Sequence, residues 1–282
     1  MKVVFFTSDG FDENEVFRYM FAHVASSFDD VSIVAVRRPI GSWLERYRQK
    51  LRRIRRFGSG TGNTVELISS YPLQRLIIDR NERGAQEAIR ALPRPPLKPE
   101  DAATMYVETV NGPDAVGALR KLQPDVIVQF AAGILQEQVF EVARLGTLNL
   151  HPGIAPLIKG RDPIYWALWK REPRWLGATV HLIDEGIDTG PVLAYAPVTA
   201  RYPGERYPNL FARVYEHGVE RLVEVLLRLE RGEHWKVEHP EGERVYRSTI
   251  SGWKLGVLEL RGALSRRLYR RRAKHADKPA KG

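Results

Sequence analysis

The sequence has no cysteine among its 282 residues. Disulfide bonds, thiolate zinc sites and cysteine nucleophiles are therefore excluded. A long hydrophobic run is also missing, because no segment approaches the roughly 18 apolar residues of a membrane-spanning helix. The apolar start at residues 1–6 is too short for the hydrophobic region of a signal peptide, and no cleavage site follows it. We therefore expect a soluble, cytoplasmic protein.

Two common phosphate-binding motifs are absent as well. The first apolar run ends in Thr-Ser-Asp-Gly-Phe-Asp over residues 7–12, which is not the G-x-G-x-x-G turn of dinucleotide-binding folds. No G-x-x-x-x-G-K-S/T segment occurs in the chain. Both absences argue against NAD-dependent and P-loop chemistry.

Positive charge is abundant and unevenly placed. The net charge is +10, with basic residues concentrated in two stretches, 46–56 and 261–281. Such stretches are typical of contact with an anionic partner, and a nucleotide-linked sugar, RNA and a membrane surface all remain open. A solvated helix face explains either stretch alone equally well.

Short β-branched runs alternate with segments of helical spacing along most of the chain. Predicted strands cover 2–7, 31–36, 126–130, 148–150, 178–183 and 192–198, and predicted helices cover 17–24, 114–122 and 208–232. This alternation predicts an α/β fold built on a doubly wound, mostly parallel sheet.

Composition also divides the chain. A main domain is expected over residues 1–232, with an insertion at 40–100. That insertion is predicted to hold a basic amphipathic helix at 42–57 and a proline-rich linker at 93–99. Residues 233–282 are expected to form a hairpin and then a short basic helical extension whose end is disordered.

Polar residues with catalytic potential gather near the ends of two predicted strands. Asn149 and His151 are two positions apart in a strand and so share a face, and ligands gather at the carboxyl ends of parallel strands. Asp188 follows the next strand, where its carboxylate would raise the pKa of the imidazole and keep it protonated. The amide and the imidazolium could then both donate to an oxyanion. Residue chemistry alone leaves a structural histidine as an equally good interpretation.

The order of these residues resembles a known family. Asn-Leu-His-Pro-Gly at 149–153, Gly-Ala-Thr-Val-His at 177–181 and Asp-Glu-Gly-Ile-Asp-Thr-Gly-Pro at 184–191 closely resemble the formyltransferases. The resemblance runs from about Met1 to Gly232, and the family includes glycinamide ribonucleotide, methionyl-tRNA and sugar-nucleotide formyltransferases and the formyltetrahydrofolate hydrolases. It implies a Rossmann-like catalytic domain that uses 10-formyltetrahydrofolate as a co-substrate.

The resemblance also implies roles for individual residues. It places Asn149, His151 and Asp188 on the family's catalytic trio, with His181 supporting the aspartate loop. It assigns the folate-binding surface to two segments: Ala132, Gly133, Ile134 and Leu135, and Asp184, Glu185, Gly186 and Ile187. An amine would attack the formyl carbon while Asn149 and protonated His151 stabilise the oxyanion.

The acceptor amine is predicted from departures from the family pattern. Asp9 stands where the purine-pathway enzymes have a phosphate-binding loop, and its carboxylate would repel phosphate. The roughly 50 residues after Gly232 are too few for the C-terminal barrel of the methionyl-tRNA enzymes. We therefore expect an amino sugar or another small primary amine. Hydrolysis of 10-formyltetrahydrofolate, and a retired scaffold that binds RNA or membrane, are the alternatives.

Overall fold

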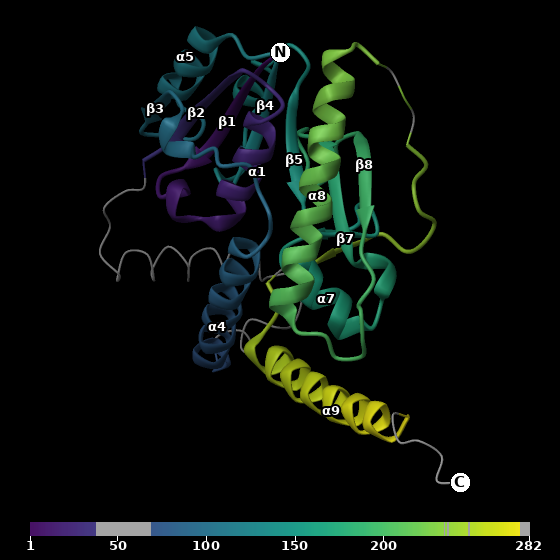
Figure 1. Cartoon of the computed structure of the whole chain (residues 1–282). Helices are drawn as coiled ribbons and strands as arrows, with labels where there is room; N and C mark the ends of the chain where they lie inside the picture. The colour runs from purple at the N-terminus through teal and green to yellow at the C-terminus, as the bar shows by residue number, and fades with distance from the viewer. Residues whose placement is uncertain (38–68, 234, 236, 248, 277–282) are drawn as a thin grey trace.

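The computed structural model describes residues 1–37, 69–233, 235, 237–247 and 249–276 (Figure 1). The predicted basic helix at 42–57 and the predicted disordered end of the tail lie outside these residues. None of the helices in the described part of the chain is long and apolar enough to cross a lipid bilayer.

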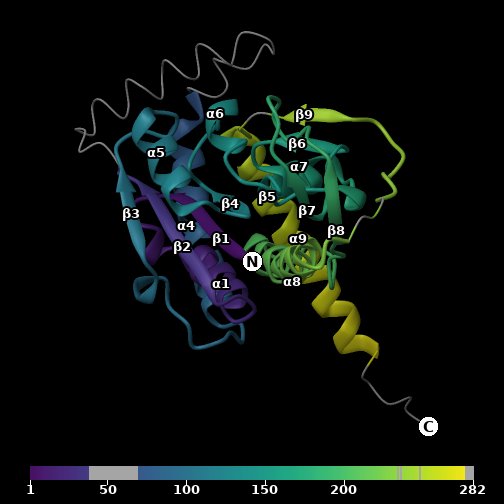
Figure 2. The same cartoon turned by 90° about the horizontal axis from the view of Figure 1, so that it is seen from above.

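A seven-stranded sheet forms the centre of the fold (Figures 1 and 2). Its strands are β1 (Lys2–Ser8), β2 (Asp30–Val36), β3 (Thr104–Val107), β4 (Val126–Phe130), β5 (Thr147–His151), β7 (Gly177–Leu182) and β8 (Val192–Pro197). They lie in the order β3-β2-β1-β4-β5-β7-β8. β1 to β5 run parallel, whereas β7 is antiparallel to both β5 and β8. The predicted mostly parallel α/β sheet is confirmed.

Helices cover both faces of this sheet. They are α1 (Glu15–Ala25), α4 (Tyr71–Arg90), α5 (Pro113–Leu122), the single turn α6 (Glu137–Phe140), α7 (Pro163–Lys170) and α8 (Tyr207–Glu230). In the view from above, α1 and α8 lie on one side of the sheet and α5 and α6 on the other (Figure 2). Alternate strand residues serve the two sides: Val3 and Phe5 pack in the core with α1 and α8, and Val4 and Phe6 pack with α5.

Helix α4 differs from the predicted insertion. It lies within the range 40–100, yet it packs against α1 and α8, and its residues Ile77 and Ile89 are buried in the main core. It precedes β3 in the chain, so it serves as the helix of the crossover from β2 to β3, the kind of connection that a parallel pair needs.

The chain after α8 also differs from its prediction. β9 (Val245–Arg247) pairs in parallel with β6 (Ile158–Gly160), whereas a hairpin is predicted for the segment after residue 232. Helix α9 follows over Gly252–Ala276 and packs against α4 and α7. Its C-terminal end extends away from the rest of the molecule (Figure 1). The division into a domain over 1–232 and an extension stays a prediction.

Candidate active site

The strand order reverses between β1 and β4. From β1 the chain passes to β2 and β3 on one side, and from β4 it passes to β5 on the other. Ligands of open parallel sheets bind in the crevice at such a reversal, beside the carboxyl ends of the strands. Here Thr7 forms an isolated bridge with Ala131, and its buried hydroxyl has no hydrogen-bond partner among the described residues. The candidate residues lie on β5, the strand next to β4 at this reversal.

The pairing of β5 with β7 gathers four polar side chains on one face. Leu150 packs toward α8, so Asn149 and His151, which alternate with it, lie on the other face. Because β7 is antiparallel to β5, it sets His181 opposite Asn149 and Thr179 opposite His151. The sheet itself therefore assembles the polar cluster.

The ring of His181 holds the Asn149 amide. His181 Nδ1 lies 2.8 Å from the Leu182 carbonyl oxygen, which can only accept, so Nδ1 carries a proton. In a neutral ring Nε2 then accepts a hydrogen bond from Asn149 Nδ2, at 3.1 Å. The half-buried Asn149 keeps its second amide hydrogen for a ligand. His181 Nε2 also lies 3.6 Å from Asp188 Oδ1, so it stands between the amide and the aspartate loop.

Asp188 reaches the same face from the loop that joins β7 to β8. Its Oδ2 lies 3.5 Å from His151 Nδ1 and accepts a hydrogen bond from the Gly160 amide at 2.8 Å. His151 Nε2 lies 3.2 Å from the Ile158 carbonyl oxygen. The sequence predicts that Asp188 lies close to Asn149 and His151, but the structure brings it there in a different way from the expected meeting of two strand ends. β7 ends at the opposite end of the pair from β5, and residues 183–191 fold back across the face.

Burial has the largest influence on the pKa values of both groups. It lowers the pKa of His151, and the Asp188 carboxylate opposes this shift without reversing it. Asp188 thus acts on the ring in the expected direction, but the expectation that the ring stays protonated is wrong, because the side chain is only 4% exposed and desolvation disfavours the charged ring. Burial opposes the ionisation of Asp188, but His181, His151 and the Gly160 amide outweigh it and lower its pKa to about 2. The resting site holds an ionised carboxylate beside a neutral imidazole.

Three groups that the sequence analysis did not single out complete the cluster. Thr179 is fully buried; its hydroxyl donates to the Gly153 carbonyl at 2.7 Å and accepts from the Ala155 amide at 3.0 Å. It thereby fixes the loop after β5. The period of two from His181 was a usable signal for Thr179. The other two groups, the Ile158 carbonyl and the Gly160 amide, belong to the backbone and leave no side-chain signal.

The segment after β4 turns its backbone outward. Ala132 and Leu135 are buried in the core beside α5, whereas Gly133 and Ile134 are exposed. Gly133 has φ +114°, a conformation that favours glycine, and a Cβ there would meet no atom nearer than 4.0 Å. The Gly133 and Ile134 carbonyl oxygens accept hydrogen bonds from Gln129 and Asn111, so the segment is held in place while the side chain of Ile134 stays 66% exposed.

The loop after β7 is folded around Asp184. The Asp184 Oδ1 accepts hydrogen bonds from the Gly186 amide at 3.0 Å and from the Thr189 hydroxyl at 2.6 Å. This tight turn leaves Glu185 and Ile187 exposed.

The two segments rest on one core. Ile183, at the start of the loop, packs against the hydrophobic cluster that contains Ala132 and Leu135. Together the segments present backbone groups and two exposed aliphatic side chains, Ile134 and Ile187. Ligand sites combine such apolar groups with a few polar backbone atoms, and a flat heteroaromatic ring suits this combination.

Comparisons with known proteins point to one group of enzymes. A family model described as formyl transferase matches residues 76–226. The methionyl-tRNA formyltransferase of Chloroflexus aggregans is 40% identical over 162 residues, which are 56% of this chain and 52% of that protein. That of Thermotoga maritima is 34% identical over 126 residues, 44% of this chain and 40% of that protein. The chain spans about half the length of the curated relatives it matches.

Solved structures show the same fold. A sugar N-formyltransferase from Shewanella sp. FDAARGOS_354 aligns with a TM-score of 0.52 at 17% identity, over 93% of this chain and 88% of that one. A 4-N formyltransferase from Francisella tularensis aligns with a TM-score of 0.53 at 16% identity, over 93% and 87%. At these identities the likeness is one of architecture.

Proposed function

The chain belongs to the formyl transferase family, and we propose that it transfers a formyl group from 10-formyltetrahydrofolate to a primary amine. The observation that carries the proposal is the convergence of Asn149, His151 and Asp188 on the face of β5 opposite Leu150. The acceptor that we favour is an amino sugar or another small amine.

The donor site is assigned to the two segments that share a core. When bound, 10-formyltetrahydrofolate supplies an activated formyl group, and residues 132–135 and 184–187 would hold its ring. The remaining amide hydrogen of Asn149 would donate to the formyl oxygen as negative charge develops there. One such donor is typically worth about 3 kcal/mol of activation free energy.

Asp188 and His151 are assigned to proton transfer. As the amine nitrogen bonds to the formyl carbon it loses one proton, and the nitrogen that leaves the formyl group gains one. The ionised Asp188 carboxylate would take up the proton that the amine loses and share it with Nδ1 of His151, 3.5 Å away. A neutral His151 can accept a proton at this nitrogen, so the low pKa of the ring favours the relay over the predicted role as a charged oxyanion donor.

Two acceptor classes follow from separate observations. Asp9 follows the carboxyl end of β1, at the point where the strand order reverses, and its carboxylate suits a cationic amine better than a phosphate. This favours a small amine.

The curated relatives are named methionyl-tRNA formyltransferases, which makes the amine of a charged tRNA the second candidate. A cytoplasmic location stays a prediction.

An acceptor panel tests the proposal. Purified protein is mixed with 10-formyltetrahydrofolate, and release of tetrahydrofolate is followed with amino sugars, nucleotide-linked amino sugars, methionyl-tRNA or no acceptor. We expect release only when an amine is present, with one formylated product per tetrahydrofolate. Equal release without any amine would show hydrolysis instead. No release with any amine would overturn the proposal and leave a retired scaffold.

A further inference from the structure

The outer side of α9 carries a row of exposed apolar residues. Trp253, Leu260, Leu264 and Leu268 follow one another at intervals of seven, four and four, which is one side of a helix. They are 62%, 62%, 53% and 59% exposed. On the opposite side, Leu255 is 1% exposed where α9 packs against α4 and α7. The helix therefore has two apolar sides, and the described part of the chain covers only one of them.

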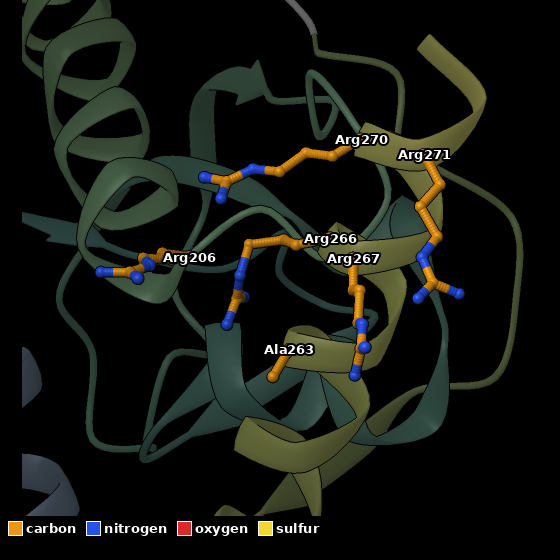
Figure 3. A pocket seen from close by; sticks show the side chains of 6 residues that line it. All are labelled: Arg206, Ala263, Arg266, Arg267, Arg270 and Arg271. Atoms are coloured by element: carbon orange, nitrogen blue, oxygen red, sulfur yellow. The ribbon is translucent and has the colours of Figure 1, made fainter. Parts of the chain in front are cut away.

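Arginines gather beside this outer apolar side. A hollow of about 380 Å³ is lined by Arg206, Ala263, Arg266, Arg267, Arg270 and Arg271. Figure 3 shows Arg266 and Arg270 extending from α9 toward the side where Arg206 lies. By helical geometry Arg267 and Arg271 lie directly along the apolar row. Five arginines therefore line one hollow at the edge of the apolar row.

Acidic side chains do not neutralise this cluster. No carboxylate lines the hollow, and within the described ranges no acidic side chain forms an ion pair with any of its arginines. Arg266 donates to the Gly204 carbonyl oxygen at 2.7 Å, a contact that brings no negative charge to the cluster. The nearby Glu205 is buried and bonded to the Arg201 amide and to Arg213. The hollow therefore carries positive charge that could bind an anion.

The row of apolar side chains and the adjacent arginine hollow together fit one kind of partner. A second copy of this chain would set arginines against arginines. A nucleic acid would meet the arginines but leave the row of leucines in water. On an anionic phospholipid surface, leucine and tryptophan side chains enter the boundary of the acyl chains while guanidinium groups meet phosphates. We propose that α9 lies flat on an anionic phospholipid surface and that the arginine hollow receives a lipid phosphate headgroup.

This contact would leave the candidate active site open. Arg206 directly precedes α8, and α8 covers the face of the sheet toward which Leu150 packs. Asn149 and His151 lie on the other face. Membrane contact through α9 therefore does not require those residues, and variants of α9 should keep the basal activity.

Vesicle flotation of the full chain tests the proposal. One set of vesicles holds two parts phosphatidylcholine to one part phosphatidylglycerol, and the other holds phosphatidylcholine alone. We expect binding to the anionic vesicles and a large loss in salt. Each basic residue near such a surface contributes about a fivefold gain in partitioning, so the double variant Arg267→Gln/Arg271→Gln should bind about 25-fold more weakly. Leu264→Gln/Leu268→Gln should weaken binding at least tenfold.

Matched variants distinguish a specific contact from a general loss of charge. Arg120→Gln/Lys121→Gln removes two exposed charges from α5, and Leu76→Gln replaces a leucine of α4 that is 68% exposed. Both should bind vesicles nearly as well as the wild type. Equal loss in these controls, or no binding to anionic vesicles at all, would overturn the proposal.

Two other outcomes would replace it. RNA binding that the two arginine substitutions weaken, together with absent vesicle binding, would make the cluster a nucleic-acid surface. A dimer in solution that Leu264→Gln/Leu268→Gln converts to a monomer would make the apolar row an interface between copies. Light scattering and an unfolding curve for each variant separate these outcomes from a loss of fold.

Discussion

Replacing Asp188 by Asn removes one charge and leaves the shape of the side chain almost unchanged. The Gly160 amide can still donate to the new side-chain oxygen, as it does to Oδ2 at 2.8 Å. What is lost is the negative charge that lies 3.5 Å from His151 Nδ1 and 3.6 Å from His181 Nε2. Stability and proton transfer should both suffer from this single change.

The pKa of Asp188 sets the size of the stability effect. It falls from an ordinary 3.8 to about 2, which corresponds to about 2 kcal/mol in favour of the ionised form. Because the folded pKa is the lower one, this stabilisation is fully present above 3.8 and is lost as the pH falls through 2. We therefore expect Asp188→Asn to lower the free energy of unfolding by about 2 kcal/mol at pH 7 and by about half of that near pH 3.

Denaturant unfolding at both pH values measures the effect, and steady-state kinetics measures the function. The substitution should lower kcat about a hundredfold or more, with a smaller change in KM, because it removes a proton carrier. Asp29→Asn, at an exposed position, is the matched control and should leave both quantities unchanged. An Asp188→Asn protein with the stability and kcat of Asp29→Asn would show that the Asp188 carboxylate neither stabilises the fold nor carries the proton.

Three further substitutions test the parts that support the site. Thr179→Val removes both hydrogen bonds that hold the loop after β5 and should lower the free energy of unfolding by about 1–3 kcal/mol in denaturant titrations. At Gly160, where φ is +93°, an Ala Cβ would lie 2.2 Å from the Arg247 carbonyl oxygen. Gly160→Ala should therefore cost more than about 1 kcal/mol, whereas Gly117→Ala in the open part of α5 should not destabilise the fold. The lowered pKa of His151 means that the folded state binds a proton less readily than the unfolded state, so the free energy of unfolding falls as the pH drops below 6.5. His151→Gln should reduce this dependence of the free energy of unfolding on pH. An unchanged slope below pH 6.5 would contradict a buried neutral ring.

The strands and the gathering of polar residues on β5 could be predicted because their signals are local. Each strand is a short apolar run, and Asn149 and His151 share a face through the period of two. The direction of β7 could not be predicted, since alternation is the same in a parallel and an antiparallel strand. The pairing of β9 with β6 joins segments far apart in the chain and has no local signature.

Helix α4 was missed because its buried side is partly polar. Gln74 and Asn81 occupy positions where an apolar residue would have revealed the helical period. Their amides are satisfied by partners that only the fold provides, the Ile250 carbonyl and the Tyr165 hydroxyl. The predicted protonation of His151 was wrong for a similar reason. The sequence places a carboxylate nearby but does not reveal how completely the ring is buried, and burial lowers its pKa.

The most direct test of the central claim follows a labelled formyl group in a single turnover. Wild-type protein and Asn149→Ala are each mixed with labelled 10-formyltetrahydrofolate and the best amine from the acceptor panel. The label should appear on the amine with the wild type, and about a hundredfold to a thousandfold more slowly without the Asn149 amide. Transfer at the wild-type rate by Asn149→Ala, or no labelled amine from the wild type, would contradict the assignment of this site to formyl transfer.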